Sequence, residues 1–365
     1  MKIVDVRVHP VTVARRYATA AGRGTPGVQV SHYYFLEIET DTGLTGVGEV
    51  SDISPRAALD GQPLRAARYA ERLRTYLAGR DPFDLERLER EIGTPAFPFR
   101  SQMAAAVDIA CHDLIGKATG QPLYRLLGGR YHERLPVCWV AYIRSPEEME
   151  PEIAQKVAEG FRAFKLKVGR DIDADIERVK LVRDLAGEDA HIKLDANGAW
   201  SVEEAIVNLK RLEPYRPAAI ETPIPVGDVE AMRAVKQRVG VPYMEHAGSP
   251  EATLEYVRAG VVDVFKISAG GLGGLRRARK VTAIVEAAGA AAYVGSTVEM
   301  GLGTTALGHF AVSSAACGWP CDLRGPLLLV DDVLTQPVSF AHGMLTIPDA
   351  PGLGVSLDPA KLSAL

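Results

Sequence analysis

Acidic residues recur in this chain at a nearly constant interval. Asp195, Glu221 and Glu245 are separated by 26 and then 24 residues. One strand, one helix and two loops of a parallel β/α barrel take roughly 25–30 residues, so the interval predicts that these acids end successive strands. Three carboxylates at neighbouring strand ends repel one another unless a cation binds there. Ligation by oxygen alone favours Mg²⁺, with Mn²⁺ as an alternative. Zinc is disfavoured because, His246 apart, no histidine or cysteine falls in the same register.

Lysines flank these acids on both sides. Lys165 and Lys167 are two residues apart, so on a strand they point to the same side. Two neighbouring ammonium groups disfavour each other's charge and a metal ion adds to this, so we expect their pKa values to fall toward the range of a general base. Lys266, in the apolar strand expected at 264–267, is predicted to face them across the barrel mouth. A metal ion with a lysine on each side suits the removal or return of a proton α to a carboxylate, through an enediolate.

Other polar residues fall close to the same strand ends. Asn197 shares the side of Asp195 and is predicted to touch substrate or to orient a ligand. His246 adds a titratable group beside the expected metal. Glu299 lies near the end of the seventh expected strand, where it either hydrogen-bonds the site or caps a helix.

The order of the expected elements predicts two differently built domains. Residues 1–127 show strands followed by helices, which is typical of an α+β domain. In residues 128–324 apolar strands alternate with amphipathic helices, and seven or eight such units favour a β/α barrel. The segment 325–365 is rich in Pro and Gly and is expected to return to the first domain. Within the first domain we expect strands at 2–13, 32–40 and 45–50, a loop at 15–27, and helices near 64–78, 84–92 and 99–119.

Composition and charge exclude several classes of protein. The 365 residues are 47% hydrophobic and 24% charged, the balance of an ordinary globular enzyme. The net charge is −4 without a basic block, so nucleic acid is not expected as a partner. No signal-peptide core or membrane-spanning apolar run is found, and the four cysteines lack metal-site spacing. We therefore expect a cytoplasmic protein with reduced thiols.

The residues singled out above resemble the signature of a known family. Lys165-Leu166-Lys167, Asp195-Ala196-Asn197, Glu221, Glu245 and Lys266 are similar to the enolase superfamily, in the muconate lactonizing enzyme subgroup of the mandelate racemase/muconate lactonizing enzyme family. The resemblance covers nearly the whole chain. It implies an α/β fold, a modified TIM barrel of the (β/α)7β type, whose N-terminal α+β capping domain is completed by the C-terminal tail. It also implies Mg²⁺ bound by the three acids, Lys167 and Lys266 as the acid/base pair, and Lys165 in support of Lys167.

Segments near the C-terminus favour particular enzymes within this family. Residues 295–304, 322–329 and 351–355 are similar to muconate and chloromuconate cycloisomerases. Dipeptide epimerases of this family usually carry Asp-x-Asp here, to hold a substrate ammonium. In this chain Asp322 is followed two residues later by Arg324, which suits an acidic substrate. Both residues are therefore candidates for binding or supporting the substrate.

The resemblance also implies that two loops of the first domain cover the pocket. These loops are expected at 15–27 and 51–56. Arg15, Arg16 and Arg23 in the first loop are candidates to attract a second carboxylate.

The resulting hypothesis is a Mg²⁺-dependent enzyme that acts on a small carboxylate, with lactonisation of cis,cis-muconate or a substituted muconate as the leading reaction. In that reaction a lysine protonates the enolate that forms when one carboxylate adds to the diene, and either Lys167 or Lys266 can take this part. The alternatives are a racemase or epimerase of an N-acylated or modified amino acid, a dehydratase of the same subgroup and, more remotely, a barrel that binds metal and ligand without turnover. The relatives usually read Asp-Glu where this chain reads Glu245-His246, which leaves the substrate open. By the resemblance, a homo-oligomer (dimer or octamer) is expected, with no nucleic-acid or membrane partner.

Overall fold

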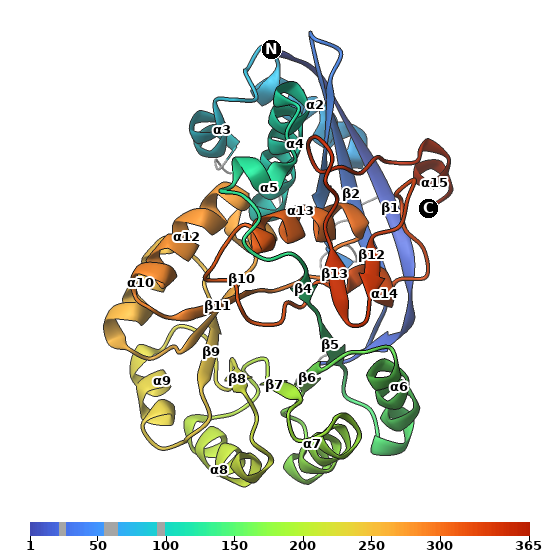
Figure 1. Ribbon diagram of the computed structural model, residues 1–365. Coiled ribbons are helices and arrows are strands. Elements are labelled where there is room, and N and C mark those ends of the chain that lie inside the picture. The colour runs from blue at the N-terminus through green and yellow to red at the C-terminus, as the bar shows by residue number, and fades with distance from the viewer. Residues whose placement is uncertain (22–26, 55–64, 93–98) are drawn as a thin grey trace.

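The first part of the chain is an antiparallel sheet covered by helices in the computed structural model, which describes residues 1–21, 27–54, 65–92 and 99–365. Leu36 and Ile38, alternate residues of one strand, are buried against Leu73 and Leu114 of two helices, so one face of the sheet forms the core of this domain. The helices lie beside the sheet in the upper part of Figure 1. The elements are β1 (Ile3–Thr19), β2 (Val28–Thr40), β3 (Thr45–Val50), α2 (Ala66–Leu77), α3 (Leu85–Ile92) and α4 (Arg100–Thr119).

The first strand is longer than the sequence suggested. We expected a loop over 15–27, but β1 continues to Thr19. Arg15 lies inside the strand, where its Nε donates to Ser31 Oγ at 2.8 Å and its guanidinium pairs with Asp52 in a buried contact. This ion pair with a distant residue holds a segment whose composition alone is typical of a loop.

Seven parallel strands form the second part of the molecule. They follow one another in sheet order from β5 to β11, and helices pack around them in the lower part of Figure 1. The strands are β5 (Cys138–Ala141), β6 (Ala163–Lys167), β7 (His191–Asp195), β8 (Ala219–Glu221), β9 (Tyr243–His246), β10 (Val264–Ile267) and β11 (Ala291–Val294). The helices are α6 (Pro146–Ala158), α7 (Ile172–Ala186), α8 (Val202–Leu212), α9 (Val229–Lys236), α10 (Pro250–Ala259), α11 (Ala269–Leu272), α12 (Leu275–Ala287) and α13 (Gly301–Val312).

A short eighth segment joins the first and last barrel strands. The N–H of Asp322 donates to the carbonyl of Val294 at 3.0 Å, and the N–H of Cys138 donates to the carbonyl of Cys321 at 2.7 Å. The segment therefore bridges β11 and β5 by single hydrogen bonds, without forming a regular strand. The expected α/β fold, an enolase-type barrel with an N-terminal capping domain, is confirmed.

The C-terminal segment returns to the first domain. The N–H of Leu353 donates to Asp113 Oδ1 on α4 at 2.8 Å. The N–H of Thr12 on β1 donates to the carbonyl of Leu365 at 3.0 Å. The tail is thus tied to both a helix and a strand of the capping domain, as expected. The remaining short elements are α5 (Leu123–Leu126), β4 (Leu135–Pro136), η2 (Glu213–Tyr215), α14 (Gly325–Leu328), β12 (Ser339–Ala341), β13 (Met344–Thr346) and α15 (Pro359–Ala364).

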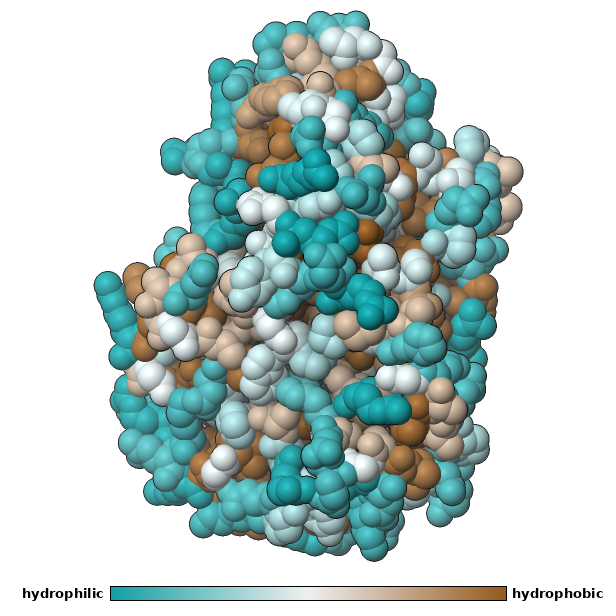
Figure 2. Space-filling view, in the orientation of Figure 1, coloured by the Kyte–Doolittle hydropathy of each residue, from teal (hydrophilic) through white to brown (hydrophobic). Residues whose placement is uncertain are grey.

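The surface mixes polar and apolar residues. On the face shown in Figure 2, brown apolar residues lie among teal polar ones over both parts of the molecule. Within the described residues, no helix has both the length and the apolar character needed to span a membrane.

All four cysteines are buried and free. Burial raises the pKa of the Cys138, Cys317 and Cys321 thiols to about 12. These side chains therefore stay protonated and act as small apolar groups of the core.

Candidate active site

The barrel strands bring the predicted acids and lysines to one end. Lys167 on β6 is in register with Asp195 on β7, and Asp195 is in register with Glu221 on β8. Asp195 and Glu221 are fully buried. The carboxyl ends of parallel barrel strands are where active sites of this architecture lie. The regular interval in the sequence therefore predicted a real row of side chains.

Lys165 lies among three carboxylates. Its Nζ is 2.6 Å from Glu221, 3.0 Å from Asp322 and 3.1 Å from Asp195. Burial by itself would lower the pKa of Lys165, but attraction to Asp322 and Glu221 outweighs it and raises this pKa well above its usual value. Among the side chains of the site, the surrounding carboxylates therefore outweigh the neighbouring Lys167, and the lowering of the pKa expected for Lys165 from Lys167 and a metal ion together is not found.

The other two lysines reach the acids from different strands. Lys167 Nζ donates to Asp195 Oδ2 at 2.6 Å and to Asn197 Oδ1 at 3.0 Å. Lys266 Nζ donates to Glu221 Oε1 at 2.8 Å. The strands that carry the two lysines, β6 and β10, are separated by three others in the sheet. Asn197 thus orients Lys167, and its contact with substrate or with a ligand stays a prediction.

The lysines keep two of the acids ionised. Burial alone would raise the pKa of Glu221, but Lys165 and Lys266 reverse this and hold it well below its usual value. Burial and the charge of Glu221 likewise act to raise the pKa of Asp195, and Lys167 with Lys165 lowers it. The two carboxylates are therefore charged although water does not reach them.

Glu245 is held differently from these two acids. Its Oε1 accepts from Thr222 Oγ1 and from the N–H of His246, each at 2.7 Å. Its Oε2 is buried and has no hydrogen-bond partner among the described residues. Burial, together with the negative charges of Glu221 and Asp195, raises the pKa of Glu245 to about 7.

His246 turns its ring toward the acids. Its Nε2 is 3.1 Å from Glu221 Oε1. The positive charge of Lys266, and then burial, lowers the pKa of His246. This residue is therefore a neutral neighbour of Glu221.

The donor set of this site fits a hard divalent cation. In the parts of the chain that the structure describes, no three histidine, cysteine, aspartate or glutamate side chains converge closely enough to hold a metal ion. Instead, the ammonium groups of Lys165 and Lys266 form ion pairs with the carboxylate of Glu221. Even so, three buried carboxylates end successive strands, and the Glu245 Oε2 atom lacks any donor. Oxygen ligands of this kind are those that Mg²⁺ takes in proteins.

A buried polar layer beneath the acids was not predicted. Lys193 Nζ donates to Asp322 Oδ1 at 2.8 Å and lies 3.7 Å from the centre of the Tyr293 ring. The hydroxyl of Tyr293 donates to Glu221 Oε2 at 2.5 Å. Lys193 precedes Asp195 by two residues on β7, so the alternation of a strand would have placed it on the same side. Asp322, expected to bind or support the substrate, supports the lysines.

Two predicted residues of the described parts of the chain, Glu299 and Arg16, do not line this site. Glu299 accepts from the N–H of Thr297 at 2.9 Å and from its Oγ1 at 2.8 Å, so it stabilises the turn after β11; helix α13 has no side-chain cap, so the expected capping role is not found. Arg23 lies outside the described residues. Arg16 lies in β1 and lines a separate cavity of about 530 Å³.

A small cavity of about 50 Å³ opens on the three lysines. Arg324 reaches the same space from the segment that closes the barrel. The full lining is Val140, Tyr142, Lys165, Lys167, Lys266, Ser296, Val298, Asp322, Arg324, Gly325 and Leu328.

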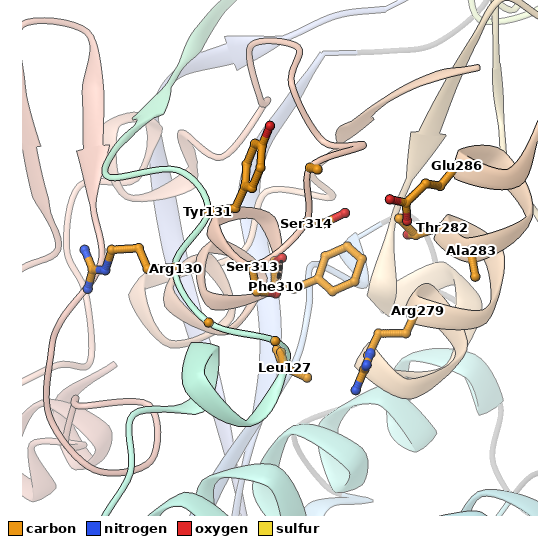
Figure 3. A pocket seen from close by; sticks show the side chains of 13 residues that line it. Leu127, Arg130, Tyr131, Arg279, Thr282, Ala283, Glu286, Phe310, Ser313 and Ser314 are labelled. Atoms are coloured by element: carbon orange, nitrogen blue, oxygen red, sulfur yellow. Dashed lines mark hydrogen bonds between the residues drawn. The ribbon is translucent and has the colours of Figure 1, made fainter. Parts of the chain in front are cut away.

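A larger cavity, of about 420 Å³, contains none of these residues. Figure 3 shows Arg279 and Glu286 of α12 on one side of it, and Tyr131 and Arg130 on the other. Phe310 of α13 lies between them. We find no acid–lysine constellation there.

Both parts of the chain match known families. Residues 3–128 match the family described as Mandelate racemase / muconate lactonizing enzyme, N-terminal domain. Residues 148–361 match the family described as Enolase C-terminal domain-like.

Individual relatives match along their whole length. The hydrophobic dipeptide epimerase of Enterococcus faecalis is 32% identical over 98% of this chain and 100% of the relative. The structure of the Enterococcus faecalis dipeptide epimerase complexed with Mg and the dipeptide L-Leu-L-Tyr has a TM-score of 0.86, at 30% identity over 98% of this chain and 100% of that one. The N-succinyl-L-Arg/Lys racemase of Bacillus cereus is 29% identical over 100% of this chain and 98% of the relative. Muconate lactonizing enzyme from Pseudomonas fluorescens, complexed with muconolactone, has a TM-score of 0.91 at 26% identity, over 100% of this chain and 98% of that one.

These relatives catalyse three different reactions at similar identity to this chain. The similarity therefore identifies an isomerase and does not single out the muconate lactonizing subgroup that the sequence suggested.

Proposed function

The chain belongs to the mandelate racemase/muconate lactonizing enzyme family of the enolase superfamily, and from this premise we propose that it moves a proton at the carbon α to a substrate carboxylate with the help of Mg²⁺. The observation that carries the proposal is the pair formed by Lys167 and Lys266. Both line one cavity, and each is bonded to a different carboxylate. A lysine on each side of a bound substrate can take a proton from one face or return it to the other.

Asp195, Glu221 and Glu245 would hold the metal ion. All three are buried, and within the described parts of the chain no group donates a hydrogen bond to Glu245 Oε2. Bound Mg²⁺ supplies stabilisation of the negative charge that develops on the substrate carboxylate as the α-proton leaves. Mn²⁺ takes similar oxygen ligands and is the expected substitute.

The side chains around the metal site would control the proton. Asn197 accepts from Lys167, which keeps that ammonium group beside the acids. Lys165, held among three carboxylates, would stay protonated and keep positive charge next to Lys167.

The leading reaction is lactonisation of cis,cis-muconate or a substituted muconate. One carboxylate of the substrate adds to the diene, and a lysine protonates the α-carbon of the enolate that results. The structural match to a muconate lactonizing enzyme over the full chain supports this reaction.

A second candidate is a racemase or epimerase of an N-acylated or otherwise modified amino acid. Two lysines on one cavity suit it, because one takes the α-proton and the other returns a proton to the opposite face. The relatives from Enterococcus faecalis and Bacillus cereus carry names of this kind.

Proton NMR in D₂O separates these reactions. The protein with Mg²⁺ and cis,cis-muconate should give muconolactone that carries one deuterium. If muconate is unchanged and N-succinyl amino acids exchange their α-proton, the second candidate replaces the first. If neither class of carboxylate exchanges or adds a proton, the proposed proton transfer is wrong.

Single lysine variants then sharpen the answer. A racemase should stop interconverting enantiomers in both Lys167→Met and Lys266→Met, because each direction needs both lysines. A cycloisomerase should depend strongly on the one lysine that protonates the enolate. A barrel that only binds ligand would keep its affinity in both variants and show no turnover in any of them.

A further inference from the structure

Arg324 is a buried guanidinium without an anionic partner. The residue is 3% exposed, and its Nε and Nη1 atoms have no hydrogen-bond partner among the described residues. Its contact with the hydroxyl of Tyr17 adds no negative charge. Asp322, two residues earlier, forms ion pairs with Lys165 and Lys193 instead. The guanidinium therefore keeps unused donors in a place that water does not reach.

Aromatic rings hold this guanidinium in place. Its Cζ lies 5.0 Å from the centre of the Trp139 ring and 5.2 Å from that of Tyr142. Ring faces attract a cation without accepting its N–H bonds in the plane of the guanidinium. The planar fork of Arg324 thus remains available for a ligand, in an orientation fixed before the ligand arrives.

Arg324 is one of the residues that line the catalytic cavity. Arg324 lines the same 50 Å³ space as Lys165, Lys167 and Lys266. A substrate whose reacting carboxylate lies at the lysines therefore brings its other end toward Arg324.

No nearby acid of the described residues is left over to neutralise Arg324. Glu152 accepts from the Trp139 Nε1 at 2.7 Å and from the Tyr17 hydroxyl at 2.9 Å, and it also pairs with Arg144. A ligand can therefore supply the negative charge that these side chains do not provide to Arg324.

We propose that Arg324 binds a second carboxylate of the substrate, so that this enzyme selects dicarboxylates over monocarboxylates and over substrates with a distal ammonium. The proposal rests on the proposed function, which places the first carboxylate at the acids and lysines. Muconate and N-succinyl amino acids both carry such a second carboxylate. Ligand binding separates these two substrate classes.

Binding of matched inert ligands tests the proposal. We would titrate the Mg²⁺-loaded protein with adipate and hexanoate, which share a six-carbon chain and differ in the second carboxylate. N-Succinylglycine and N-butyrylglycine form the second pair. One charge-assisted hydrogen-bonded contact corresponds to roughly 10- to 100-fold in affinity, so we expect the diacid of one pair to bind tighter by that factor. The pair with the larger ratio tells whether the second carboxylate belongs to a muconate-like or an N-succinyl substrate.

Arg324 variants assign the effect to this side chain. In Arg324→Met the ratio between diacid and monoacid should fall to about one, and Arg324→Lys should keep part of it because the charge remains but the planar fork is lost. Arg211→Met is the matched control, since it removes an exposed guanidinium paired with Asp173 and should leave the ratio unchanged. Equal binding of both members of each pair by the unmodified protein would overturn the proposal even if the Arg324 variants failed to fold.

The outcome is separable from that of the proposed function. Proton exchange in D₂O with equal binding of diacid and monoacid removes only the Arg324 subsite. Discrimination between the ligand pairs without any proton exchange removes the proposed reaction and leaves Arg324 as an anion-binding residue.

Discussion

Carboxylates are buried in two regions of this molecule, and different kinds of group donate hydrogen bonds to them in each region. At the barrel mouth, Asp195 and Glu221 are bonded to the ammonium groups of lysines. At the seam between the capping domain and the rest of the chain, Glu49 accepts from the N–H groups of Met300 at 2.8 Å and Gly303 at 2.7 Å. The donors at the mouth are mainly lysine side chains and those at the seam mainly backbone groups, although the N–H of Asn197 also bonds Asp195 and Lys117 also bonds Asp113.

Asp113 at the seam also accepts hydrogen bonds from backbone N–H groups. Its Oδ1 accepts from the N–H of Leu353 at 2.8 Å and its Oδ2 from the N–H of Val47 at 3.1 Å, so it joins the tail to β3. A backbone N–H cannot leave its acceptor unless the chain moves, whereas a lysine side chain can rotate away. Buried acids bonded to the backbone therefore hold the fold, and buried acids bonded to lysines can exchange partners during a reaction.

The largest effect on stability is expected at the seam. Asp113→Ala removes the acceptor of two backbone N–H groups and the carboxylate that lies 2.7 Å from the ammonium of Lys117, which keeps its bond to the Thr45 carbonyl. We expect the free energy of unfolding to fall by about 4 kcal/mol, since breaking a buried pair costs 3–5 kcal/mol. Denaturant unfolding followed by circular dichroism measures this loss. Asp113→Asn, which keeps one carbonyl acceptor, should lose less, and an unchanged midpoint in Asp113→Ala would remove the contrast between the two regions.

At the mouth the expected effect is on rate instead. Lys266→Met should lower turnover by about 10²- to 10⁴-fold, the range for loss of a positioned acid or base. Its free energy of unfolding should change by about 1 kcal/mol or less, because Glu221 keeps hydrogen bonds from Lys165 and Tyr293. Parallel measurements of turnover and denaturant unfolding check both statements.

Lys193→Met is the matched control for this lysine. Lys193 is fully buried, does not line the catalytic cavity and bonds the carbonyl of Pro320 as well as Asp322, so its loss should cost more stability than that of Lys266. Equal destabilisation in Lys266→Met and Lys193→Met would show that the mouth lysines hold the fold as well.

The mouth could be predicted from the sequence and the seam could not, for a physical reason. Parallel strands of similar length end in one ring, so an interval of one β/α unit between Asp195, Glu221 and Glu245 was enough to place them. The donors to Glu49 and Asp113 are backbone groups 251 and 240 residues away, and no side chain marks them in the sequence. Acids that bond the backbone therefore look like any other acid until the fold is known.

Two details of the mouth and its surroundings also needed the structure. The pKa of Lys165 rises because attraction to carboxylates from other strands outweighs its burial, whereas from the sequence only Lys167 and an expected metal ion could be weighed. The end of β1 was misplaced because the pairing of Arg15 with Asp52 overrides a local composition that is typical of a loop. In both cases a contact between distant residues outweighed the local pattern.

Acid provides a milder test of the seam. His309 on α13 accepts from the N–H of Tyr124 at its Nδ1, at 3.2 Å, and its Nε2 lies 3.0 Å from the carbonyl of Leu353. Burial lowers the pKa of His309 to about 4, below the value of about 6.5 expected in the unfolded chain. The unfolded chain therefore takes up the proton first as the pH falls from 6.5 toward 4, and stability present above pH 6.5 is lost over that interval. We expect about 2–3 kcal/mol of this loss by pH 4.5.

The variant His309→Gln isolates this contribution. Glutamine can accept and donate at similar positions but does not titrate in this range. Its free energy of unfolding should therefore fall less between pH 7 and pH 4.5 than that of the unmodified protein. Identical pH dependence in the two proteins would mean that the protonation of His309 does not open the seam.

Addition of Mg²⁺ should produce the smallest change in the free energy of unfolding. It should also distinguish the barrel mouth from the seam most directly. A ligand that binds only the folded state stabilises it by RT ln(1 + [L]/Kd), which is about 1.4 kcal/mol at ten times Kd. We expect Mg²⁺ to raise the unfolding midpoint of the unmodified protein and of the seam variant Asp113→Asn, but not that of Glu245→Gln. In the latter the unpartnered Oε2, which the structure leaves free for a cation, is replaced by a neutral group. Potassium chloride at equal ionic strength is the control for screening. An equal rise in all three proteins would place the cation outside the carboxylates of the mouth, because only a site that uses Glu245 loses its affinity when that charge is removed.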